Sequence, residues 1–371
     1  MKKSAELRSY PLLLSILANP KAISDLTITQ WNELIRLARV SDLLANLYAS
    51  FERLNLLEAI PEKPLLHLRS AQTMTDKHEQ TIVWEAVQIS AALQPLNAPV
   101  VLLKGAAYLL QGLTASKGRV FHDVDVMVPK ASIDAAEPAF KDAGWMGAKQ
   151  DAYDQRYYRE WMHELPPMSH YARCVTLDLH HTIIPPTAAL KPDASKLFDA
   201  IVPVKSHPGL YTLSPVDMVL HSATHLFYDD EIGRGMRDLV DLHHLLTEFS
   251  ARPDFWPKLL DRSLELDLDY PLACALKYCK ELLQTDIPND VFTKAKQKLR
   301  FPNWMMDKLF VYGLKPEHEL CDNWPTSTAR FVLYVRSHYL RMPLYLLVPH
   351  LLRKAFREET IEPIENPRPL G

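Results

Sequence analysis

The sequence predicts an α+β protein in which a small mixed β-sheet lies between two helical regions. Two observations support this fold class. Apolar residues recur at helical spacing at the start and again in the second half of the chain, while short β-branched runs cluster between these parts. We expect four parts, namely an N-terminal helical region over 1–97, the sheet-containing core over 98–210, a C-terminal helical domain over 211–360 and an irregular tail over 361–371.

The first 97 residues are expected to be helical, with no chemistry of their own. Apolar side chains follow a helical period from Thr27 to Leu57, and a similar pattern continues from Gln72 to Leu96. Glycine is absent from this whole segment. We expect its helices to pack against the sheet or to help bind an acceptor.

A short strand, a glycine turn and a short helix are expected next. Val100–Leu103 is an apolar run, Lys104-Gly105 breaks it, and Ala106–Gln111 has a helical pattern. A glycine turn allows close backbone approach, and free N–H groups at a helix start can bind phosphate. Lys104 adds a positive charge there. An ordinary strand–helix unit would show the same pattern, so the functional interpretation depends on the acidic residues further along the chain.

The stretch from Gly118 to Val128 is expected to be a strand that bears two acids. Asp123 and Asp125 are two residues apart, so their side chains share one face. Two such carboxylates repel each other unless a cation lies between them, and oxygen ligands suit Mg²⁺. Arg119 lies just ahead of them. Acid pairs at this spacing are common by chance, and a solvated strand face is the alternative.

A third acid fits the same interpretation. Arg173–Ile183 is another strand candidate, and it places Asp178 between two leucines. An unpaired buried carboxylate is costly, so a metal shared with the acid pair would explain its position. A buried salt bridge is the alternative.

These residues resemble the polymerase-β-type nucleotidyltransferase superfamily, and more narrowly its bacterial branch of nucleotidyltransferases with no settled substrate. The resemblance lies in Leu103-Lys-Gly-Ala106, Arg119, Asp123-Val-Asp125 and Leu177-Asp-Leu-His180. Ala106 replaces the serine that usually follows the glycine, and a Lys-Gly pair stands in its place. The resemblance covers roughly residues 98–182 and extends more weakly to about residue 250.

The resemblance implies a nucleotidyltransferase core that transfers a nucleoside monophosphate from an NTP such as ATP to an acceptor hydroxyl and releases pyrophosphate. The acceptor stays open: a sugar, a small metabolite, a protein or an RNA end. The implied catalytic residues and ligands of two Mg²⁺ or Mn²⁺ ions are Asp123, Asp125 and Asp178. The implied nucleotide-binding residues are Lys104, Gly105, Ala106, Arg119 and Arg237. Two alternatives are a nucleotide-binding relative without transfer activity and a membrane-surface assembly factor.

The region after Asp178 is expected to be helical, with a helix start at Ser214. His221 and His225 lie one helical turn apart, a spacing that can bind zinc. The glutamate of the usual zinc motif is missing, so we favour core or cleft histidines. Arg237 and Asp241 can pair across one turn of the following helix. Alternatively, as the resemblance implies, Arg234 or Arg237 could reach a triphosphate from the far side of the cleft.

Composition bounds the remaining possibilities. The net charge of −3 and pI of about 6.6 argue against a long nucleic-acid footprint. The four cysteines have no zinc spacing, which favours a cytoplasmic location. No transmembrane helix or signal peptide is expected. Residues 328–357 are apolar and basic, so they can contact a membrane surface, although packing on their own domain is favoured.

Overall fold

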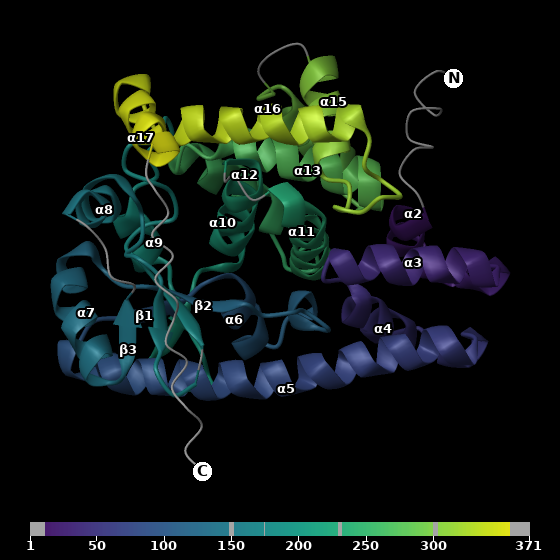
Figure 1. Cartoon of the computed structure of the whole chain (residues 1–371), viewed down its shortest axis with the longest axis horizontal. Helices are drawn as coiled ribbons and strands as arrows, with labels where there is room; N and C mark the ends of the chain where they lie inside the picture. The colour runs from purple at the N-terminus through teal and green to yellow at the C-terminus, as the bar shows by residue number, and fades with distance from the viewer. Residues whose placement is uncertain (1–11, 148–151, 174, 229–231, 300–302, 357–371) are drawn as a thin grey trace.

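A computed structural model describes residues 12–147, 152–173, 175–228, 232–299 and 303–356, without the side chains of 152, 303 and 354–356. It has the expected α+β architecture, in which a seven-stranded mixed sheet is surrounded by helices from both ends of the chain (Figure 1). The predicted tail over 361–371 and the position of Cys174 lie outside the described residues.

The N-terminal region is helical, as the periodicity predicts. α3 begins after Thr27 because this side chain and Gln30 form a reciprocal capping box. Its buried face includes Trp31 and Leu34. α5 extends beneath the sheet and beneath the preceding helices (Figure 1). The elements are α2 (Leu12–Ala18), η2 (Pro20–Asp25), α3 (Ile28–Val40), α4 (Leu44–Arg53), η3 (Leu57–Ala59), α5 (Glu62–Leu93) and η4 (Gln94–Leu96).

The sheet has the order β3-β4-β5-β2-β1-β7-β6. Its strands are β1 (Val100–Leu102), β2 (Asp123–Met127), β3 (Trp145–Gly147), β4 (Met168–His170), β5 (Thr176–His180), β6 (Val202–Pro203) and β7 (Leu210–Thr212). β2 runs antiparallel to β1 and parallel to β5. β1 pairs in parallel with β7, and the outer pairs are antiparallel. β2 and β5 therefore lie side by side in the middle of the sheet.

Two predicted strands are shorter in the structure than the apolar pattern suggested. The stretch from Gly118 to His122 does not join β2, and Gly118 adopts a φ of 66° that favours glycine. A Cβ at Gly118 would lie 2.3 Å from the backbone of Ala45, so the N-terminal helices pack directly on this turn. β5 likewise covers only the centre of the predicted range 173–183.

Shorter helices connect the strands: α6 (Lys104–Leu110), η5 (Thr114–Ser116), η6 (Lys130–Ser132), α7 (Ile133–Asp142), α8 (Ala152–Arg156), the π-helical turn η7 (Tyr157–Trp161) and α9 (Ala194–Asp199). α6 includes Lys104 and Gly105, so the predicted break lies inside the first helical turn.

The second half of the chain is helical. α10 begins after Ser214, whose hydroxyl accepts from the Asp217 N–H at 3.2 Å, which confirms the predicted helix start. α10 and α11 are buried along most of their lengths. The elements are α10 (Pro215–Tyr228), η8 (Ile232–Arg234), α11 (Gly235–Phe249), α12 (Phe255–Glu265), α13 (Asp269–Leu283), α14 (Asn289–Lys296), α15 (Asn303–Gly313), α16 (Trp324–Arg341) and α17 (Leu344–Phe356).

Among the described residues, no helix combines the length and the apolar character that crossing a bilayer requires. α16 lies along the side of the molecule opposite α5 (Figure 1). One face of α16, including Ala329 and Leu333, is buried against the protein.

Candidate functional site

A polar cavity of about 180 Å³ lies beside the two central strands. Its lining combines acidic and basic residues from β2, β5, α6, α10, the start of α11, the segments that join them and the end of α16. The lining residues are Lys104, Arg119, His122, Asp123, Asp125, Met162, His163, Glu164, Asp178, His225, Arg234, Arg237 and Arg341. All three predicted acids and three of the five predicted nucleotide-binding residues therefore contribute to one cavity.

Asp125 is the most strongly engaged acid of the cavity. Its Oδ1 accepts hydrogen bonds from the Lys104 ammonium at 3.1 Å and from His180 Nε2 at 3.0 Å. Burial raises the pKa of Asp125, but the charge of Lys104 and the hydrogen bond from His180 outweigh burial and hold it well below its ordinary value. Asp125 is therefore ionised at neutral pH.

Asp178 lies directly opposite Asp125, because the parallel register of β2 and β5 pairs these two positions. Its Oδ1 is buried and has no hydrogen-bond partner among the described residues. Burial, and then the charge of Asp125, raise the pKa of Asp178 to about 7. A buried carboxyl oxygen without a partner is a costly arrangement, and a bound cation would relieve it.

Asp123 opposes Thr176 in the same register and therefore shares its face with Asp125. Oxygens of the three carboxylates do not converge as tightly as ligands of a bound ion: among the described residues, the group with three ligand atoms within 4.8 Å of one another is His163, Glu164 and His180.

Lys104 places its ammonium in the cavity from the first turn of α6. Its φ of 42° lies in the left-handed region, which is rare for a residue other than glycine. Such a backbone is held by its surroundings, here the following helix and the ion pair with Asp125. Ala106 is buried and, like Gly105, does not line the cavity.

Arg119 is fixed by α11. Its Nε donates to Asp241 Oδ2 at 2.9 Å, and its guanidinium lies 5.6 Å from the ring centroid of Phe121. A Cβ at Gly105 would lie 2.2 Å from Arg119 Nη1, so a side chain there would displace the guanidinium. The requirement for glycine at 105 is therefore a requirement for space.

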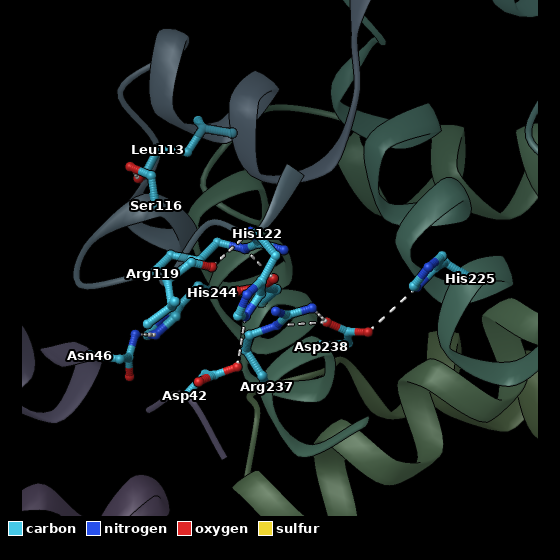
Figure 2. A network of polar contacts seen from close by, with 12 residues as sticks. Asp42, Asn46, Leu113, Ser116, Arg119, His122, His225, Arg237, Asp238 and His244 are labelled. Atoms are coloured by element: carbon cyan, nitrogen blue, oxygen red, sulfur yellow. Dashed lines mark hydrogen bonds and ion pairs between the residues drawn. The ribbon is translucent and has the colours of Figure 1, made fainter. Parts of the chain in front are cut away.

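Arg237 is also paired, but not as the sequence predicted. The expected partner Asp241 binds Arg119, and Arg237 donates to Asp238 Oδ1 from Nε and Nη2 at 3.1 and 2.9 Å. Figure 2 shows this chain of contacts continuing from Asp238 to His225, at 3.4 Å. The prediction of an i,i+4 pair was wrong because the strand-side Arg119 competes for Asp241.

The N-terminal region contacts the cavity lining at Asp42. This residue, in the turn between α3 and α4, lies 3.0 Å from His122 Nε2 (Figure 2). Nearby, Asn46 Nδ2 donates to the Lys117 carbonyl at 3.2 Å. These helices thus hold the segment that leads into β2, in agreement with the expectation that they pack against the sheet.

His163 and Glu164 were not singled out from the sequence, and His180, which ends the quoted motif Leu177-Asp-Leu-His180, was given no role. His180 is buried and its Nδ1 lies 3.4 Å from Glu164 Oε2. Burial lowers the pKa of His180, but the hydrogen bond to Asp125 and the charge of Glu164 outweigh burial and raise it. The sequence signal was present only as the His-Glu pair at 163–164, 16 positions before His180.

The helical pair His221 and His225 does not form a metal group among the described residues. Burial, followed by the charge of Lys104, lowers the pKa of His221 well below its ordinary value, so this imidazole is neutral in the core. His225 instead faces the cavity and Asp238. The expectation that these histidines lie in the core or line the cleft agrees with this arrangement.

No curated protein matches the sequence. A family model described as uncharacterised nucleotidyltransferase matches residues 28–284, which is more than half of the chain. The matched range includes every residue that lines the cavity except Arg341. The chain therefore belongs to this family of uncharacterised nucleotidyltransferases.

Proposed function

We propose that the protein is a polymerase-β-type nucleotidyltransferase of the bacterial branch, which transfers a nucleoside monophosphate from an NTP to an acceptor hydroxyl and releases pyrophosphate. The observation that carries this proposal is the pairing of Asp125 with Asp178 across parallel strands, in a cavity that also holds Lys104, Arg119 and Arg237. Phosphoryl transfer requires two components, carboxylates that hold metal ions and positively charged side chains that bind phosphate.

Asp123, Asp125 and Asp178 are the residues that would hold Mg²⁺, and the unsatisfied Asp178 Oδ1 fits such a ligand role. Bound Mg²⁺ or Mn²⁺ would neutralise charge on the reacting and leaving phosphates. Asp178 is also the residue that we propose to accept the proton of the acceptor hydroxyl.

Lys104 is the proposed main phosphate ligand. Its ammonium bonds to Asp125 and can turn to a triphosphate when a cation satisfies that carboxylate. Arg119 and Arg237 are each neutralised by a carboxylate of α11, so they would position phosphates by hydrogen bonding more than by net charge. A volume of 180 Å³ suits phosphate groups and ions, and the nucleoside would extend outside it.

The test is incubation of the protein with each α-labelled NTP, Mg²⁺ and a cell extract, followed by identification of the molecule that acquires label. Asp125→Asn should abolish labelling and pyrophosphate release. The matched control is Asp134→Asn, because this carboxylate is 97% exposed and lies outside the cavity. Mg²⁺-dependent NTP binding without any pyrophosphate release would instead support a nucleotide-binding relative that does not transfer.

Three described cysteines, Cys274, Cys279 and Cys321, are free and buried, which favours the cytoplasm as the proposed location.

A second proposal concerns the surface of α16 and α17. The exposed side chains between Asn323 and Leu352 are uncharged, and the exposed Arg353 follows them. The segment 324–357 contains six Arg and Lys and no Asp or Glu. The exposed large side chains of this face are Trp324, Phe331, Val332, Tyr334, Val335, Tyr339, Leu344, Tyr345, Val348, Leu351 and Leu352. Aromatic and aliphatic side chains with nearby basic residues suit the interface of an anionic bilayer.

We propose that this face contacts an anionic lipid surface. Wild-type protein should sediment with phosphatidylglycerol vesicles more than with phosphatidylcholine vesicles, and replacing Phe331 and Tyr339 by serine should reduce sedimentation. Met74→Ser, on the exposed side of α5, is the matched control. Equal recovery with and without vesicles, or a dimer that the double variant dissociates, would overturn the proposal.

A further inference from the structure

His163, Glu164 and His180 form a compact group next to the proposed Mg²⁺ ligands. One ligand atom from each lies within 4.8 Å of the other two. Glu164 Oε2 is central, at 3.8 Å from His163 Nε2 and 3.4 Å from His180 Nδ1. The three atoms surround a common position, as the ligands of a single ion do.

The backbone holds these side chains together. The segment around Glu164 lies along the end of β5, where Glu164 and His180 form an antiparallel bridge. The Leu165 N–H donates to the Leu179 carbonyl at 2.8 Å, and the His181 N–H donates to the His163 carbonyl at 2.9 Å. The group is therefore set by strand pairing and not by flexible side chains alone, which favours a preformed site.

His180 has the surroundings of a metal ligand. Its side chain is 2% exposed, its Nε2 is hydrogen-bonded to Asp125, and its Nδ1 has no hydrogen-bond partner among the described residues. In metal sites, the second ring nitrogen of a ligating histidine commonly donates to a carboxylate, which fixes the tautomer and directs the other nitrogen at the ion. Asp125 provides such a carboxylate here.

The site is also accessible. His163 and Glu164 line the same cavity as Asp123 and Asp178, and their side chains are 14% and 23% exposed. An ion can therefore enter without opening the core. Two imidazoles and one carboxylate select zinc and its neighbouring transition metals over Mg²⁺, which prefers an all-oxygen shell.

We propose that His163 Nε2, Glu164 and His180 Nδ1 bind one divalent transition-metal ion of the zinc class, separate from the Mg²⁺ position at the aspartates. This proposal does not rest on nucleotidyl transfer, because the ligands and the test involve no nucleotide. The ion would be linked to the aspartates through the hydrogen bond between His180 and Asp125. A bare ion pair between Glu164 and a charged His180 is the alternative arrangement of the same atoms.

The full-length protein, freed of metals with EDTA and dialysed, is titrated with Zn²⁺ by calorimetry and with Co²⁺ by visible absorption, without nucleotide. We expect saturable binding of one ion per chain and a Co²⁺ spectrum with nitrogen ligands. His163→Ala and Glu164→Gln should each weaken binding at least tenfold. Their partly exposed positions make them tolerable to the fold, which thermal unfolding checks.

Two controls separate this site from others. Asp123→Asn should retain Zn²⁺ binding, because Asp123 belongs to the proposed Mg²⁺ position. His207→Ala should also retain it, since His207 lines a different cavity. Asp125→Asn should weaken binding less than loss of a ligand, because this residue acts through His180. Absence of saturable Zn²⁺ and Co²⁺ binding to the wild type, or equal binding by wild type and His163→Ala, would refute the site whether or not the protein transfers nucleotides.

Discussion

The raised pKa of Asp178 makes the stability of the metal-free protein depend on pH. An unfolded aspartate titrates near 3.8, whereas folded Asp178 titrates near 7. Between these values the folded chain keeps a proton that the unfolded chain has released. The contribution of Asp178 is therefore fully present below about pH 4 and is lost as the pH rises through 7.

The magnitude follows from the difference of about three pKa units. At 1.36 kcal/mol per unit, Asp178 destabilises the metal-free protein at pH 8 by up to about 4 kcal/mol relative to pH 4. For a chain of 371 residues this corresponds to about 5 °C in Tm. Asp178→Asn removes the titrating group, so the Tm of the variant should rise relative to that of the wild type as the pH rises.

Thermal unfolding in EDTA, followed by circular dichroism from pH 5 to pH 8, measures this effect. Asp134→Asn is the matched control and should follow the wild type. Addition of Mg²⁺ at pH 8 should raise the Tm of the wild type more than that of Asp178→Asn, because binding to the folded state adds stability. A constant difference in Tm between wild type and Asp178→Asn at every pH would show that the pKa of Asp178 is not raised in the folded protein.

Three further outcomes are expected. Lys104→Met should weaken NTP binding by about tenfold or more in calorimetry, because a charged hydrogen bond is worth about 1.5–3 kcal/mol, whereas Lys117→Met, on the surface, should not; equal affinities would remove Lys104 from the phosphate site. Gly105→Ala should lower the free energy of unfolding by about 1–3 kcal/mol in denaturant titration, because its Cβ displaces Arg119; unchanged stability would contradict this packing argument. Burial, then the neighbouring histidine, lowers the pKa of His244 to about 3, so stability should fall as the pH drops from 6.5 towards 3, and less so in His244→Asn.

The shared face of the first two acids could be predicted from the sequence, because their positions follow from local rules. Alternation along a strand places Asp123 and Asp125 on one face wherever the strand lies. The third acid, Asp178, needed only the additional assumption that its strand is a neighbour of β2. The register that puts it opposite Asp125 is a property of the folded sheet.

The partners of the basic residues could not be predicted in the same way. Asp241 binds Arg119, which is 122 positions away, in place of Arg237, one helical turn away. Helical spacing predicts Arg237 as the partner of Asp241, and only tertiary packing brings Arg119 closer to it. The closeness of His163 to His180 could not be predicted for the same reason, because the pairing of Leu165 with Leu179 is what places them together.

The contacts between the turn at Gly118 and the helices before residue 98 restrict which substitutions this part of the fold can accept during evolution. A Cβ at Gly118 would meet the backbone of Ala45 and Asn46, so any side chain at 118 would push the N-terminal helices away from this turn. The turn that leads into β2 therefore depends on packing against the N-terminal helices as well as on the sheet. Among relatives, we expect glycine at position 118 wherever the N-terminal helices pack in this way, and we expect a graft of residues 98–210 onto foreign helices to lose the orientation of β2.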